Sequence, residues 1–179
     1  MLSKEKIMTT EKIEAKEILD QLDETTSAFL NVISSFTEEE INIIPCEKGW
    51  SAAQVADHVM QSTDSMVNSL NTKGKITLRS IDEGVQGLKD VFLNFDTKLQ
   101  SPKFILPGKD LYNREELIEK LNNSFWQLKT LSNTVDLSET INHVVFGDIT
   151  KLEIVHFVVY HTQRHIHQLK NIFQTVANR

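Results

Sequence analysis

Apolar residues recur at every third or fourth position along much of this chain, which is the spacing of one face of an α-helix. The pattern first predicts an amphipathic helix from about Thr10 to Ser35, with Glu and Lys on the other faces. A short helical turn is expected next, because Thr37 can cap it and Glu40 follows three residues later. The apolar stripe comprises Ala15, Ile18, Leu22, Phe29, Val32, Ile33 and Phe36.

Two further helices begin at residues that are typical N-caps. Ser51 and Gln54 have the spacing of a capping box, in which two side chains satisfy free N–H groups at a helix start. The helix that follows should end near Asn71. Asn113, with Glu116 three residues later, begins another amphipathic helix with a leucine-rich stripe.

A fourth long helix is predicted from Thr150 to about Val176. Thr150 and Glu153 form a second potential capping box. Apolar residues occupy several sides of this helix, which favours a central position in the fold and, further, contact with a second subunit.

The segment 74–112 interrupts the helical pattern with glycines and prolines. We expect a short helix within Val85–Leu99 and an extended stretch at Phe104–Leu106. The predicted fold is therefore an all-α four-helix bundle with a long crossover connection between helices 2 and 3. Residues 1–179 should form a single domain, with residues 1–9 frayed or disordered.

Composition narrows the class of protein. Hydrophobic residues make up 40% and charged residues 25%, as in ordinary globular proteins, and only 6 glycines and 3 prolines argue against a turn-rich β fold. A net charge of −6 without a basic run disfavours nucleic acid as a partner. No apolar run is long enough for a membrane span, and a single cysteine, Cys46, allows no internal disulfide. We therefore expect a cytoplasmic protein without membrane or nucleic-acid partners.

Two histidines in the last helix, His161 and His165, are four residues apart and share one face. The same face carries Ile154, Phe157, Val158, Gln168 and Ile172, so both imidazoles should point into the interior. Buried imidazoles need partners, which are either a metal ion or backbone carbonyls and carboxylates. The pair differs from the zinc-protease motif H-E-x-x-H, because Thr162 stands where that motif has its catalytic Glu.

A third ligand is expected for a catalytic metal site. His156 and His167 lie on the opposite side of the last helix, and His143 precedes it as a surface or loop-packing residue. His58 lies on the second helix at the edge of its apolar face, so geometry favours His58.

Two motifs give the chain a family resemblance. Gly49-Trp50-Ser51, with His58 eight residues after the tryptophan, resembles the start of the second helix in the DinB/YfiT-like superfamily. His161-x-x-x-His165-x-x-Gln168 resembles the last-helix motif of that superfamily. The resemblance implies a divalent metal held by His58, His161 and His165. Three imidazoles suit zinc, nickel, iron or copper, and we expect zinc or nickel ahead of the other two. It also implies a homodimer, and relatives that include S-transferases using bacillithiol or similar thiols.

Three neutral imidazoles leave a divalent ion its charge and an open position, where it lowers the pKa of bound water or deprotonates a thiol. From the resemblance, our first hypothesis is thiol-dependent S-transferase-like chemistry on a small-molecule substrate, with a low-molecular-weight thiol as cosubstrate. The alternatives are a metal-dependent hydrolase and a non-catalytic metal-binding or regulatory bundle.

Four other residues receive secondary roles. Gln168 lies one turn beyond His165 and either orients a metal-bound ligand or is an ordinary core amide. Asp57 points about 100° away from His58, which suggests a solvent or capping role. Arg164 suits the rim of the site or a structural ion pair, and Trp50 packs at a helix end or lines the mouth of the site.

Overall fold

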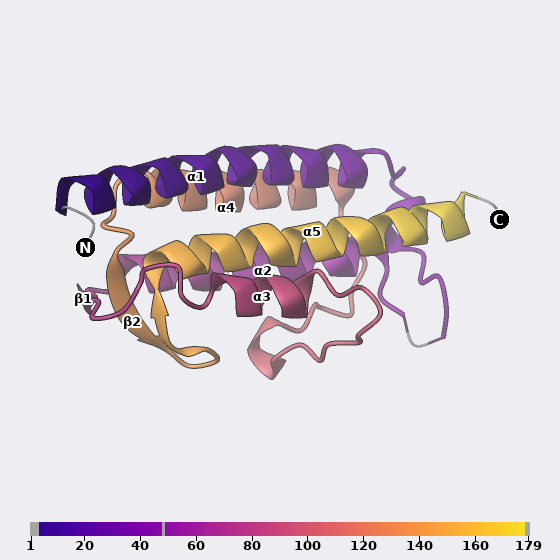
Figure 1. Cartoon of the computed structure of the whole chain (residues 1–179). Coiled ribbons are helices and arrows are strands. Elements are labelled where there is room, and N and C mark those ends of the chain that lie inside the picture. Colours follow the sequence, from indigo (N-terminus) through magenta and orange to yellow (C-terminus); the bar gives the residue numbers. More distant parts are fainter. Residues whose placement is uncertain (1–3, 48, 178–179) are drawn as a thin grey trace.

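Four long helices form a bundle in the computed structural model, which describes residues 4–47 and 49–177. Helix α1 packs against both α4 and α5, and α2 packs against the same two helices, so each helix has two bundle neighbours (Figure 1). The four-helix bundle predicted from the apolar pattern is therefore confirmed. Its helices are α1 (Lys4–Ser34), α2 (Ala52–Asn71), α4 (Arg114–Ser132) and α5 (Lys151–Val176).

The capping residues predicted from the sequence define the starts of three helices. Ser51 and Thr150 each close a complete capping box, with Gln54 and Glu153 respectively, and the Asn113 side chain accepts from the Glu116 N–H. Helix α1 begins at Lys4, before the expected start near Thr10. Residues 1–3 of the segment expected to be frayed lie outside the described residues.

A small antiparallel sheet corrects the all-α expectation. Its strands are β1 (Lys75–Ile76), β2 (Glu139–His143) and β3 (Gly147–Thr150), in the order β1-β2-β3. Gly147, with φ of 66°, begins β3 in a left-handed conformation that glycine adopts readily. Strands this short contain too few alternations to stand out in the sequence, and Ile141 and Ile149 bury them against the bundle.

The connection from α2 to α4 contains β1, helix α3 (Val85–Phe92) and a 3₁₀ turn (Lys103–Ile105). Helix α3 confirms the short helix expected in this segment, and it packs against α5 (Figure 1). The extended stretch predicted at Phe104–Leu106 is wrong for Phe104 and Ile105, because the Ile105 N–H bonds to the Pro102 carbonyl and closes a helical turn, whereas Leu106 is extended. Only Ile105 of the three apolar side chains is buried there.

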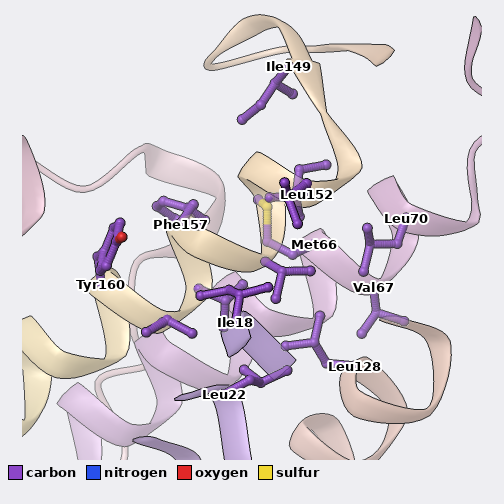
Figure 2. Packing of buried hydrophobic residues seen from close by; sticks show 14 of the residues in the cluster. Ile18, Leu22, Met66, Val67, Leu70, Leu128, Ile149, Leu152, Phe157 and Tyr160 are labelled. Carbon is purple, nitrogen blue, oxygen red and sulfur yellow. The ribbon is translucent and has the colours of Figure 1, made fainter. Parts of the chain in front are cut away.

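Two apolar clusters fill the bundle. The first joins Ile18, Leu22, Met66, Leu128 and Phe157 at the end near the sheet (Figure 2). The second surrounds Phe29, Phe36, Val59, Leu121 and Leu169. Along α5, Tyr160 is the last buried residue of the first cluster and Leu169 is the first buried residue of the second. The histidine motif lies between these two residues. Within the described part of the chain, no helix is long and apolar enough to cross a membrane.

Candidate metal centre

Three imidazoles from two helices converge in the interior of the bundle. His58 on α2 places its Nε2 3.1 Å from the Nε2 of His161 on α5, and the Nε2 of His165 lies 3.1 Å from the same atom. All three side chains are buried. The structure thus brings together the three histidines that the sequence analysis singled out, and their nitrogens could hold one metal ion.

Two neighbouring oxygens determine which nitrogen is protonated in the rings of His58 and His165. The Nδ1 of His58 lies 2.8 Å from the carbonyl oxygen of Ile105, and the Nδ1 of His165 lies 2.8 Å from the amide oxygen of Gln168. Both oxygens only accept hydrogen bonds, so each Nδ1 carries the proton. In the neutral rings each Nε2 then presents a lone pair to the centre.

Hydrogen bonds among the three Nε2 atoms cannot pair all of them. A neutral His161 can donate its Nε2–H to only one of its two neighbours, and the other lone pair then faces nitrogen at 3.1 Å. Nitrogens bound to a tetrahedral zinc ion at about 2.0–2.1 Å are about 3.3 Å apart. With its proton on Nδ1 instead, a neutral His161 also presents an Nε2 lone pair, and the three lone pairs at this spacing fit a divalent cation.

Burial keeps the three imidazoles neutral. Desolvation is the main cause that lowers the pKa of His58, and it lowers the pKa of His165 to about 3. The pKa of His161 falls well below its usual value, through desolvation first and then through the neighbouring imidazoles and Arg164. Neutral imidazole is the form that binds metals.

A cavity of about 1020 Å³ opens onto the three histidines. Aromatic rings surround the imidazoles: Trp50 lies 5.0 Å from the His58 ring, and Phe157 stacks on His161 at 5.1 Å. The middle of α2, at Ser62, Ser65 and Met66, and segments 98–102 and 104–106 form other parts of the wall. Trp50 therefore lines the site, which is one of the two roles expected for it.

Asp57 does not face solvent or cap a helix, which were the roles expected for it. Its side chain is buried, and its Oδ2 accepts hydrogen bonds from the Tyr112 hydroxyl at 2.7 Å, the Gly108 N–H at 3.0 Å and the Gln61 amide at 2.9 Å. Asp57 thereby anchors the segment that supplies the Ile105 carbonyl to His58. No local sequence pattern indicates Gly108 and Tyr112 as partners, because they lie 51 and 55 residues away along the chain.

Arg164 and His143 also line the cavity. Arg164 binds backbone carbonyls of Phe92, Asn94 and Thr97, so the structural ion pair that was one of its expected roles does not form among the described residues. His143, expected in a surface or packing role, is buried in β2. Cys46 lines the cavity too.

Comparison with known proteins relates the chain to one family. The family model of the DinB superfamily matches residues 21–169. The uncharacterised protein YuaE of Bacillus subtilis (strain 168) is 22% identical over 149 residues, which are 82% of this chain and 91% of YuaE.

Two solved structures share the fold. The four-helix bundle protein TT2238 superposes with a TM-score of 0.56 and 19% identity, covering 88% of this chain and 98% of TT2238. YfiT from Bacillus subtilis superposes with a TM-score of 0.60 and 15% identity, covering 97% of this chain and 89% of YfiT. YfiT is described as a probable metal-dependent hydrolase with an unusual four-helix bundle topology.

Proposed function

The chain belongs to the DinB superfamily, and from this premise we propose that it is a divalent-metal-dependent enzyme that hydrolyses a small-molecule substrate. The observation that carries the proposal is the convergence of three buried, neutral imidazole nitrogens in the wall of a large cavity. The description of YfiT as a probable metal-dependent hydrolase favours hydrolysis as the reaction.

The metal ligands in this proposal are His58, His161 and His165. When bound, a divalent ion with an open position would supply Lewis-acid activation of water or of a substrate oxygen. The Ile105 carbonyl and the Gln168 amide oxygen orient two of the rings, and such contacts also raise the basicity of the ligand nitrogen. Phe157 and Trp50 shield the rings from bulk water.

His143 adds a hydrogen-bond donor to the site. Its Nδ1 accepts the Val145 N–H at 3.1 Å, so the neutral ring carries its proton on Nε2. Burial lowers the pKa of His143, which keeps the ring neutral. We propose that this N–H contacts the substrate.

Thiol-dependent S-transfer is the second candidate, and one feature of the cavity favours it. None of the described Asp or Glu side chains lines the cavity, so it offers no carboxylate as a general base. A thiol, with a pKa of about 8.5, loses its proton far more readily than water. S-transfer would therefore depend less than hydrolysis on a general base supplied by the protein.

One set of assays separates these candidates. Purified protein loaded with zinc, nickel or manganese is offered activated esters, phosphate esters and amides, and separately a small thiol with an electrophilic aryl halide. We expect metal-dependent turnover of at least one ester or amide. Turnover only with thiol and electrophile would replace hydrolysis by S-transfer, and bound metal without turnover in either assay would identify a non-catalytic binding protein.

Substitution of one ligand tests the metal site directly. His161→Ala should lose stoichiometric metal, measured by elemental analysis, and metal-dependent turnover, while its circular dichroism stays helical. His156→Gln is the matched control, since His156 lies on the same helix and bonds to the Tyr160 hydroxyl. Retention of metal by His161→Ala would refute the assignment.

A further inference from the structure

The charged side chains that line the cavity have one sign. The chain contains 25 acidic and 19 basic residues. The cavity wall nevertheless includes Lys98 and Arg164 and, within the described chain, no carboxylate. A cavity lined by one sign of charge attracts ligands of the opposite sign.

The Arg164 charge is not neutralised by a neighbouring acid. Its guanidinium donates to the Asn94 carbonyl at 2.7 Å and also to the carbonyls of Phe92 and Thr97. Arginine has five N–H donors, so Nε–H and one N–H on Nη2 have no partner among the residues described. One of these carbonyls belongs to Thr97, the residue before Lys98, so Arg164 holds the backbone next to this second cationic residue of the cavity wall.

His143 provides a third donor in the cavity wall. Its Nδ1 accepts from the Val145 N–H, so its Nε2 carries the proton and has no hydrogen-bond partner in the described chain. This Nε2–H can donate to an anionic oxygen without any change in protonation.

The remaining wall is largely apolar. Phe92, Phe95, Phe146 and Phe157 contribute rings, and partly exposed Leu99, Phe104 and Val145 continue the apolar surface around the cavity. Exposed apolar side chains that gather at a cavity, and not singly over a surface, indicate a binding site for an apolar group.

We propose that the cavity binds an amphipathic anion: a molecule with an apolar body against the phenylalanine walls and a carboxylate, sulfonate or phosphate group held by Lys98, Arg164 and the His143 N–H. This proposal rests on the proposed function, because it assigns the substrate class of the same site. The charges that carry it belong to the protein, so metal-free protein should already discriminate in favour of the anion.

Two fluorescent probes with the same aromatic body test the proposal. Anilinonaphthalene sulfonate is anionic, whereas phenylnaphthylamine is neutral. Both are titrated into full-length, metal-free protein in a Trp126→Phe background, so that energy transfer from Trp50 reports on binding in the cavity. Trp126 lies exposed on α4, and Trp50 lines the cavity. We expect one anionic probe per chain, quenching of Trp50, and weaker binding as salt is raised.

Lys98→Gln distinguishes charge recognition from simple burial of an aromatic body. It should weaken the anionic probe about fivefold, as expected for one partly solvated charge, and change the neutral probe less than twofold. Lys103→Gln is the matched control, because Lys103 is an exposed lysine in the same connection but does not line the cavity. Equal effects of Lys98→Gln on both probes, or no binding of the anionic probe, would overturn the proposal.

Failure of this proposal differs from failure of the proposed function. Loss of discrimination between the probes, with metal-dependent hydrolysis intact, would refute the ligand class alone. Preserved discrimination in a protein that hydrolyses nothing would refute the reaction alone.

Discussion

Which ring nitrogen of each histidine carries the proton decides what the site can do. The Ile105 carbonyl and the Gln168 amide oxygen each take one N–H, which leaves the Nε2 lone pairs of His58 and His165 directed at His161. The motif H-x-x-x-H-x-x-Q places Gln168 three residues after His165, so the contact with Gln168 follows from helix geometry. The contact with Ile105 joins residues 47 positions apart and depends on the tertiary fold.

Gln168→Leu should weaken metal binding while leaving the helix intact. The change removes the acceptor of the His165 N–H, so the ring loses its fixed tautomer and orientation. Loss of such a contact typically reduces metal affinity about 10- to 100-fold. Competition with a chelator measures the affinity. Gln163→Leu is the control, because Gln163 lies on the same helix and bonds to Thr25 away from the cavity. Unchanged affinity in Gln168→Leu would assign Gln168 to packing alone.

At the scale of elements, Asp57 fastens the connection between α2 and α4 to the bundle. Its carboxylate accepts from Gln61 within α2 and from Gly108 and Tyr112 in the connection. Burial and the contact with Asp57 raise the pKa of Tyr112, so the phenol stays protonated and continues to donate. The 3₁₀ turn at Ile105 lies within the segment that these contacts fix.

Tyr112→Phe should therefore affect both stability and the metal site. Removing the hydroxyl takes one donor from a buried carboxylate, which costs about 1–3 kcal/mol of unfolding free energy. Loosening the connection should also weaken metal binding through Ile105. Chemical denaturation and chelator competition measure the two effects. Tyr160→Phe removes a hydrogen bond to His156 instead and should leave metal affinity unchanged. Equal metal affinity in both variants would show that the connection does not position His58.

At the scale of the whole molecule, one buried acid ties the start of α5 to the segment before α3. Glu153 accepts from the Thr150 N–H at 2.8 Å, the Gly84 N–H at 2.5 Å and Arg79 Nη1 at 2.7 Å. Desolvation raises the pKa of Glu153, but these hydrogen bonds together outweigh it, and the pKa is lowered overall.

This lowered pKa predicts part of the acid sensitivity of the fold. A carboxyl with a depressed folded-state pKa stabilises the protein above its unfolded pKa of about 4.3 and loses that contribution as pH falls through the folded value. Glu153→Gln should cost about 2–4 kcal/mol at neutral pH, because Arg79 loses its partner, and should flatten the fall in stability below about pH 4.3. Denaturation curves across pH measure this. Glu116→Gln, in an exposed ion pair with Lys120, should change little. An unaltered acid slope in Glu153→Gln would contradict the role of Glu153.

The fold was predicted well where the signal is local and less well where it is not. Apolar periodicity and the caps at Ser51, Asn113 and Thr150 predicted α2, α4 and α5. The sheet was not predicted. Strand β1 contains two residues and lies more than 60 positions from its partner β2, and the local hairpin of β2 and β3 has strands of only 5 and 4 residues, too short for a clear alternation. The 3₁₀ turn at Lys103–Ile105 was not predicted either. Only Ile105 is buried in this turn, so its three residues show no apolar repeat.

The sequence by itself determined the helices and the three imidazoles, because helix spacing and capping depend on residues within one turn of each other. It also raised the homodimer, the thiol cosubstrate and the metal's identity, which stay predictions. Only the tertiary structure decided that His58 on α2 contacts His161 on α5, and that Ile105 and Asp57 support His58. It also decided that the described side chains lining the cavity include cationic residues but no carboxylate. These features join residues distant in sequence, and their free energies depend on burial, which no local pattern encodes.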